Sequence, residues 1–415
     1  MKYFQSKLKK IILLLSAFWA TNISIAQDTT IQNILNDVRI DSIMHFVEEL
    51  SGEIPTVING VSQIITSRHK DEPGNEMAFV YIKQKLNSYS LQPDSQVYNT
   101  TCKNIFASQA GTVFPGKKYI ICAHYDDMPA GSIAPGADDN ASGTATVIEA
   151  ARIFSQYSFP FTIVYALWDE EEQGLVGSSI YAAQAAADDD LIMGVINMDM
   201  IAWDSDNDNL AFIHTKNIRN SVLMADTMNN INSTYNIGLD IVIKNPGVTA
   251  TDHASFWNEY YSAIGLSEDY YGDMNAYYHS TDDLIAYFKI PYYEKTSKLA
   301  IATLACLASD TSINVGIEEL SHERFILYSN YPNPFSYNTT ISYSLPFQCK
   351  VNITIYNLLG NKIEELVAQE QQAGNYEVSW NAAGFSSGIY YYELNSISTD
   401  ENKIFRKVRK LNLVK

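Results

Sequence analysis

The feature that most constrains the fold of this chain is an alternation of short apolar runs with amphipathic segments. Apolar runs cover 118–123, 161–168 and 194–201, and apolar residues recur at helical spacing in 143–154 and 176–187. Short runs that are apolar throughout are typical of strands buried on both faces of a sheet. Strands that alternate with helices predict an α/β domain whose sheet is mixed but largely parallel and is flanked by helices.

Helical patterns also flank this region on both sides. Residues 28–95 have the pattern of helices, with apolar residues at helical spacing in 38–50 and 76–91, and 292–309 has the pattern of a closing helix. The α/β domain is therefore expected to extend over 27–312.

The chain changes character after residue 312. Short strand-like runs occur at 340–345, 351–357, 376–380 and 388–394, with glycines between them. Regularly spaced short strands separated by turn residues predict a small all-β sandwich. We expect a linker at 313–327 and the sandwich at 328–415.

The first 26 residues have the pattern of a secretory signal peptide. Four lysines precede the apolar run 11–19, and small residues follow it. A basic segment, a short apolar segment and a small-residue cleavage site are typical of export signals, and the run is too short to span a bilayer comfortably. An uncleaved anchor is the alternative. The four cysteines allow three full pairings, and their spacing selects none.

Acidic residues dominate the charge of the chain, which carries 47 Asp and Glu against 28 Lys and Arg. Residues 27–319 hold 39 of those acids but 15 of the bases. Such a surface repels phosphate backbones, so we expect no nucleic-acid partner. No later segment approaches the length of a membrane span.

Polar residues that can bind metal stand where the apolar runs of the α/β domain end. The runs lead into His124-Tyr125-Asp126, Asp169-Glu170-Glu171-Glu172 and Asn197-Met198-Asp199, while a turn at 136–143 and a later loop at 277–283 add Asp and His. The carboxyl ends of parallel strands meet at one edge of a sheet, so these side chains are expected to converge. Mixed His and carboxylate ligands suit zinc or another first-row divalent ion.

Five motifs occur in order along residues 40–310, and together they resemble the secreted bacterial leucyl aminopeptidases, di-zinc exopeptidases of the phosphorylase/hydrolase-like fold. The motifs are His124-Tyr125-Asp126, Gly136-Ala137-Asp138-Asp139-Asn140-Ala141-Ser142-Gly143, Glu171-Glu172-Gln173-Gly174-Leu175, Asn197-Met198-Asp199-Met200 and His279-Ser280-Thr281-Asp282-Asp283.

The resemblance implies a role for each matching residue. His124 and Asp199 would hold one Zn²⁺, Glu172 and His279 the other, and Asp139 would bridge the two. Glu171 would act as the general base. Next to His279, Tyr278 could donate to the developing oxyanion, and a tyrosine that only packs there is the alternative. The supporting residues would be Asp126 for His124 and Asp283 for His279, with a cis bond between Asp138 and Asp139. Co²⁺ or Mn²⁺ could replace zinc.

The implied function is a secreted zinc aminopeptidase that removes N-terminal residues, apolar ones in the first place, from peptide or protein substrates. A carboxypeptidase or a glutaminyl cyclase of the same fold remains an alternative, as does a non-catalytic binding protein that contains metal. A carboxypeptidase needs a cation near the site, for which Arg68, Arg152 and Arg219 are candidates that the sequence does not place.

Two other signals carry less weight. Asp204 to Asn209 suggests a calcium loop, but Asn209 stands where such a loop needs glycine, so a solvated turn is the expectation. His214 is expected to be structural, as are His45, His69 and His322, whereas His253 is left open between a structural place and one that lines the pocket.

The C-terminal part resembles the type IX secretion sorting domains of Bacteroidetes-type bacteria. The resemblance rests on Tyr331-Pro332-Asn333-Pro334-Phe335, 351–360, Gly388-Ile389-Tyr390-Tyr391-Tyr392 and the basic strand-like end at 403–410. It implies export by the type IX machinery to the outer-membrane surface or the medium. An ordinary carbohydrate-binding or adhesive sandwich is the alternative.

Overall fold

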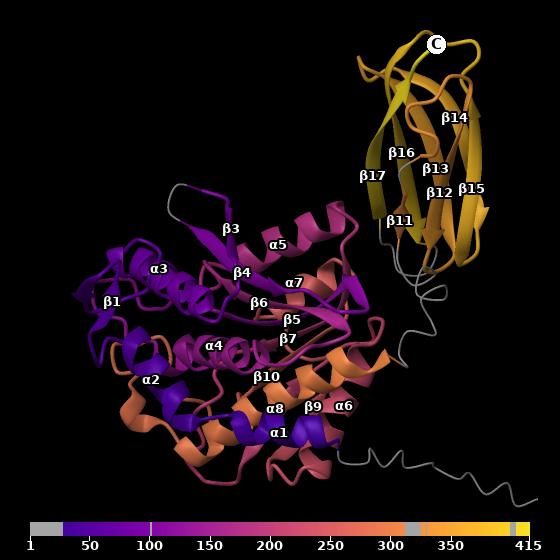
Figure 1. Cartoon of the computed structure of the whole chain (residues 1–415). Coiled ribbons are helices and arrows are strands. Elements are labelled where there is room, and N and C mark those ends of the chain that lie inside the picture. Colours follow the sequence, from indigo (N-terminus) through magenta and orange to yellow (C-terminus); the bar gives the residue numbers. More distant parts are fainter. Residues whose placement is uncertain (1–27, 100–101, 312–324, 329, 399–403) are drawn as a thin grey trace, which may run out of the picture.

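The computed structural model describes residues 28–99, 102–311, 325–328, 330–398 and 404–415 (Figure 1). An α/β domain occupies the first two segments, and an all-β domain occupies the rest. The expected signal peptide and most of the expected linker lie outside the described residues.

The α/β domain is built on an eight-stranded sheet with the order β3-β4-β6-β5-β7-β10-β8-β9. The central strands β6, β5, β7 and β10 run parallel, β3 and β4 add antiparallel strands at one edge, and β8 pairs antiparallel to β10. The sheet is thus mixed and largely parallel at its centre, as predicted. Its strands are β3 (Pro93–Val97), β4 (Lys103–Gln109), β5 (Phe114–His124), β6 (Phe161–Trp168), β7 (Leu191–Met198), β8 (Leu210–His214), β9 (Asp240–Lys244) and β10 (Ala263–Ser267).

Helices cover both faces of this sheet, with α5 and α7 on one side and α4, α8 and α1 on the other (Figure 1). Successive side chains of a strand point to opposite faces, so Ile163 and Tyr165 join one core while Val164 and Ala166 join the other. The helices are α1 (Thr29–Asp37), α2 (Ile40–Leu50), α3 (Pro73–Ser88), α4 (Gly143–Phe154), α5 (Val176–Ala187), α6 (Ser221–Thr234), α7 (His253–Asn258) and α8 (Ile290–Ser309).

The apolar periodicity closely predicted three central strands and five helices of this domain, namely β5, β6, β7, α2, α3, α4, α5 and α8. It predicted neither β4 nor the elements between β7 and α8, which are β8, α6, β9, α7 and β10. A further difference lies before residue 95. That stretch holds three helices, but it also contains the hairpin of β1 (Thr56–Ile58) and β2 (Val61–Gln63), and it runs into β3. The hairpin strands are three residues each and partly exposed, so they leave no apolar pattern to detect.

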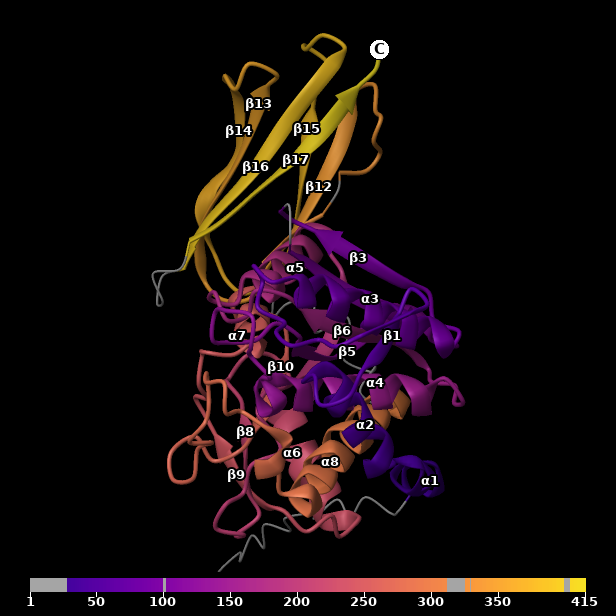
Figure 2. The same ribbon diagram turned by 90° about the vertical axis from the view of Figure 1, so that its left-hand side faces the viewer.

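The C-terminal domain consists of a three-stranded and a four-stranded antiparallel sheet around a separate core (Figure 2). Its first strand begins at Ile326, two residues before the expected border. The strands are β11 (Ile326–Leu327), β12 (Asn338–Leu345), β13 (Cys349–Asn357), β14 (Lys362–Gln371), β15 (Gly374–Asn381), β16 (Gly388–Ser398) and β17 (Ile404–Leu413).

The two domains touch through the far end of α5. Lys407 on β17 donates to the carbonyl oxygen of Ala186 and to the carboxylate of Asp189, both at 2.9 Å, and Arg409 also pairs with Asp189. Within the described part of the chain, none of the helices combines the length and apolar character needed to cross a bilayer.

Candidate metal centre

The carboxyl ends of three neighbouring strands carry the predicted ligands to one edge of the sheet. His124 is the last residue of β5, Glu172 follows β6, and Asp199 follows β7. The turn η1 (Ala137–Ser142) brings in Asp139, and the loop between β10 and α8 brings in His279. All five residues therefore converge, as parallel strands with common polarity require.

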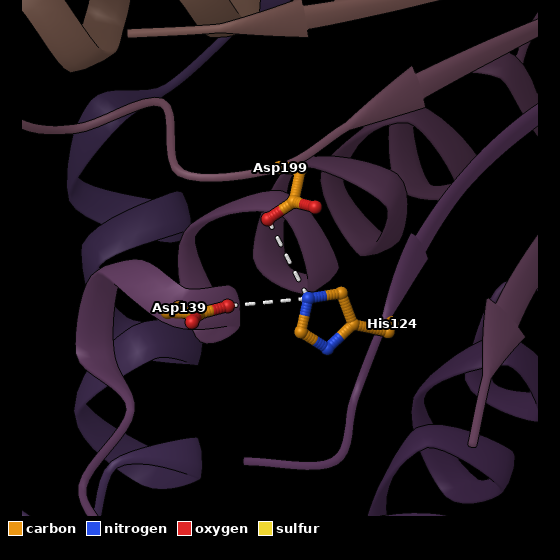
Figure 3. Close-up of side chains that lie close together, drawn as sticks. All are labelled: His124, Asp139 and Asp199. Carbon is orange, nitrogen blue, oxygen red and sulfur yellow. Dashed lines mark ion pairs between the residues drawn. The ribbon is translucent and has the colours of Figure 1, made fainter. Parts of the chain in front are cut away.

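The first group joins His124, Asp139 and Asp199 (Figure 3). Nε2 of His124 lies 3.2 Å from Oδ1 of Asp139 and 3.5 Å from Oδ1 of Asp199. All three side chains are buried, so the imidazole and both carboxylates face one another away from solvent.

The second group joins Asp139, Glu172 and His279. Nε2 of His279 lies 2.7 Å from Oε2 of Glu172 and 3.3 Å from Oδ2 of Asp139. Asp139 thus turns one carboxylate oxygen to each group, and the two groups share it.

The polar atoms at this centre fit a bound cation. Among the described residues, Nε2 of His124, Oδ2 of Asp139, Oε1 of Glu172 and Nε2 of His279 are buried and have no hydrogen-bond partner. Buried polar atoms that lack such partners are rare, and a cation that accepts lone pairs from both nitrogen and oxygen satisfies all four.

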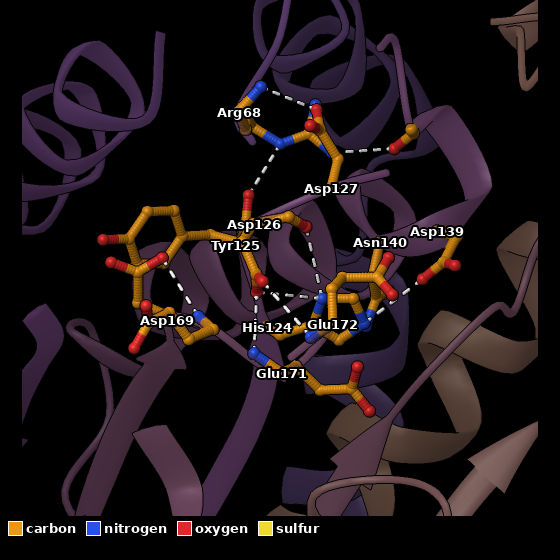
Figure 4. Close-up of polar contacts among 12 residues, drawn as sticks. Arg68, His124, Tyr125, Asp126, Asp127, Asp139, Asn140, Asp169, Glu171 and Glu172 are labelled. Atoms are coloured by element: carbon orange, nitrogen blue, oxygen red, sulfur yellow. Dashed lines mark hydrogen bonds and ion pairs between the residues drawn. The ribbon is translucent and has the colours of Figure 1, made fainter. Parts of the chain in front are cut away.

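Asp126 organises the residues around it, as Figure 4 shows. Its Oδ1 lies 3.4 Å from Nδ1 of His124, the nitrogen that faces away from the first group. Its two oxygens also accept the backbone N–H groups of Glu171 and Glu172, at 3.1 and 3.2 Å. One carboxylate therefore orients the imidazole and fixes the backbone of the adjacent glutamates.

Two expectations about η1 need correction. The cis bond lies between Asp139 and Asn140, one residue later than expected. Asp283 does not support His279; its carboxylate accepts the backbone N–H groups of Asp138 and Asp139 at 3.0–3.2 Å. The reason is topological: the loop that carries Asp283 packs against η1, where the carboxylate of Asp283 meets backbone N–H groups of the turn.

Asp138 supports the turn from the other side. Its carboxylate accepts the N–H of Ala202 at 3.0 Å and the side-chain amide of Asn275 at 3.2 Å. Asp138 therefore connects η1 to the segments after β7 and β10.

A cavity of about 270 Å³ opens beside the two groups. Glu171 lines it together with Tyr278, and the ring of Tyr278 stacks on that of His279 at 3.6 Å between centroids. The remaining lining is mostly apolar or aromatic: Met200, Val248, Ala250, Thr251, Tyr270, Tyr271 and Met274, beside Asp139, Glu172 and Asp199.

Crowded carboxylates dominate the electrostatics of the centre. Burial raises the pKa of Glu171 well above its usual range, and the charges of Asp199 and Asp252 raise it further. Burial and the charge of Asp139 raise the pKa of Glu172 to about 8. A cation among these groups relieves both the burial penalty and the mutual repulsion, so the cluster favours metal binding.

Sequence reasoning did not place Arg68, which is fully buried behind the centre (Figure 4). Its guanidinium donates to the carbonyl oxygens of Leu50, Tyr125, Pro135 and Gly136 at 2.7–2.8 Å. A lone arginine in a loop gives no signal of this role, because its partners are backbone atoms of three separate segments.

A third acidic group lies apart from the centre. Asp204 and Asp206 of the suspected calcium loop approach Asp273, which lies in the segment after β10. The carboxylate of Asp273 accepts the indole N–H of Trp203 and the backbone N–H of Ser205, which is the behaviour of a hydrogen-bonded turn.

Comparisons with known proteins agree with this geometry. Residues 104–304 match "Peptidase family M28", and 329–408 match "Secretion system C-terminal sorting domain". A leucine aminopeptidase 1 of Ajellomyces capsulatus is 24% identical over 298 residues, which are 68% of this chain and 76% of that protein. A probable zinc metalloprotease of Pyrenophora tritici-repentis is 33% identical over 123 residues, 28% of this chain and 26% of that protein.

Solved structures share the fold of the α/β domain. The LapA aminopeptidase of Legionella pneumophila superposes with a TM-score of 0.60 at 21% identity, covering 69% of this chain and 76% of that one. A glutaminyl cyclase of Porphyromonas gingivalis gives 0.53 at 16% identity, covering 65% and 98%.

Residues 104–304, most of the α/β domain, thus match peptidase family M28, and together with the leucine aminopeptidase relatives this match supports a metallopeptidase. The C-terminal sorting domain marks the chain for export to the cell surface or the medium.

Proposed function

We propose that this protein is a secreted aminopeptidase that removes apolar N-terminal residues from peptides and holds two Zn²⁺ ions. The observation that carries the proposal is the sharing of Asp139 between two ligand groups beside a cavity lined by Glu171. Group one would be His124, Asp139 and Asp199, and group two would be Asp139, Glu172 and His279.

Two such Zn²⁺ ions, when bound, would polarise the scissile carbonyl and lower the pKa of a water molecule, so that the water can lose a proton and attack near neutral pH. Glu171 would take the proton from the attacking water and return it to the leaving amine, which requires that it stay out of the ligand set. Tyr278 borders the same cavity, and its hydroxyl would donate to the carbonyl oxygen as negative charge develops there.

The walls of the cavity support the choice of substrate. Met200, Val248 and Met274 offer an apolar surface to a substrate side chain. The surplus of acidic residues in this domain provides a long-range field that attracts the α-ammonium of a peptide.

A carboxypeptidase is less well supported. Its substrate ends in a carboxylate that needs a cation, but Arg68 is taken up by backbone carbonyls, and Arg152 pairs with Glu149 at 2.6 Å on α4. Arg219 lies between β8 and α6 and is absent from the cavity lining.

The test uses the purified full-length protein and a leucyl chromogenic amide, before and after chelation and after zinc is returned. N-acetyl-leucyl amide, an amine-blocked dipeptide and a glutaminyl peptide are run in parallel. The proposal requires cleavage of the free amine only, lost on chelation and restored by zinc. Cleavage of the blocked dipeptide would indicate a carboxypeptidase, and ring closure of the glutaminyl peptide a cyclase of the same fold.

We also propose that the sorting domain is recognised by the type IX secretion machinery. The match of residues 329–408 and the separate core of this domain support a module that acts independently of catalysis.

A further inference from the structure

Val248 stands at the border between the cavity and a buried pair of histidines. It lies in the loop between β9 and α7, and it lines the cavity with Asp199 and Met200. Both of its backbone polar groups turn away from the cavity and bond to imidazole nitrogens of the pair.

His214, the last residue of β8, accepts one of these bonds. Its Nδ1 receives the N–H of Val248 at 3.4 Å, and its Nε2 lies 3.0 Å from Oγ of Ser267. The hydroxyl of Ser267 donates its hydrogen bond to the carbonyl oxygen of Glu268, so its oxygen accepts a hydrogen bond from Nε2–H of His214. These contacts define a neutral imidazole with its proton on Nε2.

His253, the first residue of α7, makes the complementary bond. Its Nε2 lies 3.0 Å from the carbonyl oxygen of Val248, which can only accept, so Nε2 carries a proton. Its Nδ1 lies 2.7 Å from Oγ1 of Thr251, a hydroxyl that donates to a neutral ring. The ring of His253 is fully buried, which favours this neutral form with its proton on Nε2. Thr251 is itself part of the cavity lining.

The two rings are packed too tightly to rearrange independently. They stack in parallel, 5.9 Å between centroids and 6° between planes. A Cβ at Gly265 would lie 2.5 Å from Nδ1 of His253, and a Cβ at Gly247 would lie 2.6 Å from Cβ of His214. Only glycine leaves room for the rings at these two places, so β10 and the loop itself hold the pair in position.

We propose that His214 and His253 are positioning residues that set the place of Val248 as a wall for the substrate's N-terminal side chain, and thereby determine which side chains are preferred. The inference rests on the proposed aminopeptidase function. It is independent of the ligand groups, since neither histidine belongs to them.

Burial supports the neutral state of both rings. It lowers the pKa of His214 to about 4, with help from the charge of Lys244 on β9, and it lowers the pKa of His253 to about 3, with help from His214. Protonation would turn the Nδ1 acceptors into donors and break the bond from Val248 N–H.

Four substitutions test the role because Asn and Gln imitate different nitrogens of histidine. Asn places an amide oxygen at the δ position, and Gln places an amide N–H at the ε position. His214→Asn and His253→Gln can therefore keep the bonds to Val248, whereas His214→Gln and His253→Asn lose them. The measurement is the ratio of kcat/KM for leucyl and alanyl amides, with kcat on the alanyl substrate and zinc content as controls.

We expect the ratio to fall roughly tenfold in the two variants that lose the bond, as is typical when a pocket wall shifts, and to stay within about twofold in the others. The alanyl kcat and zinc content should stay near wild type throughout. An unchanged ratio in all four variants would overturn the inference. The inference would also be overturned if Gln kept the leucyl-to-alanyl ratio better than Asn at both positions, because that order is expected from side-chain volume alone.

A second measurement needs neither activity nor a substitution. NMR spectra of the ¹⁵N-histidine-labelled, zinc-loaded protein at pH 7 should show Nε2–H tautomers for His214 and His253. A charged ring or an Nδ1–H tautomer would refute the proposed hydrogen bonds of these histidines to Val248. A wild-type protein that is inactive on every amide would instead reject the proposed function, and the spectra would still decide the state of the pair.

Discussion

Glu171 and Glu172 are neighbours in the chain but have different surroundings. Asp126 accepts the backbone N–H of each (Figure 4). The carboxylate of Glu172 pairs with His279, whereas that of Glu171 lines the cavity outside both ligand groups. The proposed division into base and ligand therefore depends on which way each side chain leaves a rigid turn.

The first prediction concerns this pair. Glu171→Gln should lower kcat on the leucyl amide by about 10²–10⁴-fold, the usual contribution of a general base, and leave the zinc content unchanged. Glu172→Gln is the matched control and should lose zinc, because it removes a ligand. Metal analysis beside steady-state kinetics gives both readouts. Zinc loss in Glu171→Gln would place Glu171 in the ligand set instead.

At the scale of elements, Arg68 joins the end of α2 to two segments that lie far from it in the sequence. Its carbonyl partners lie at the end of α2, after β5 and just before η1, and its backbone N–H donates to Asp127 at 2.7 Å. Burial raises the pKa of Asp127 to about 7, against the lowering effect of Arg68, so the carboxylate depends on its partner for its charge.

We predict that Arg68→Met destabilises the fold by about 3–5 kcal/mol, the usual cost of leaving buried partners of a charged group unpaired. Arg39→Met, at an exposed position before α2, should change stability by no more than about 0.5 kcal/mol. Urea unfolding of the zinc-loaded proteins measures both. Equal midpoints for the two variants would contradict the connecting role of Arg68.

Elements with a strong apolar pattern were predictable from the sequence, and those held by other forces were not. The prediction of 161–168 and 176–187 matches β6 and α5 because burial on a sheet face dictates their composition. β14 was not predicted because most of its residues are exposed and many are charged, so it has no apolar pattern. Motifs predicted the convergence of the ligand residues. The hydrogen bonds of His214 and His253 to Val248 were not predictable, because they involve backbone atoms, which every type of residue except proline supplies equally.

At the scale of the whole molecule, the two buried histidines His214 and His253 make a destabilising contribution as the pH falls. In the unfolded chain both titrate near 6.5, while in the folded chain the pKa of His214 is about 4 and that of His253 about 3, chiefly through burial. Below pH 6.5 the two histidines therefore bind more protons in the unfolded state than in the folded state, so their contribution lowers the free energy of unfolding as pH falls toward 4.

The corresponding prediction is a loss of about 2 kcal/mol per histidine at pH 5 relative to pH 7. The side chains of Lys244, Tyr270 and Trp257 face the pair. Urea unfolding of the zinc-loaded protein at both pH values should show that His214→Asn loses about 2 kcal/mol less than wild type. Equal losses would mean that other groups account for the acid sensitivity.

The sorting domain contacts the α/β domain at Ala186 and Asp189, and neither of these residues lines the cavity. Catalysis and export are thus served by separate surfaces of one chain.

The shared carboxylate of Asp139 also bears on how such a centre can change over generations. Substitution of His124 or Asp199 leaves the other three-residue group complete, and substitution of Glu172 or His279 does the same in reverse. Substitution of Asp139 breaks both groups at once. In the proposed two-ion centre, a change to one ion therefore keeps a complete ligand group only if Asp139 is retained, which makes this the position that we expect to be least free to vary.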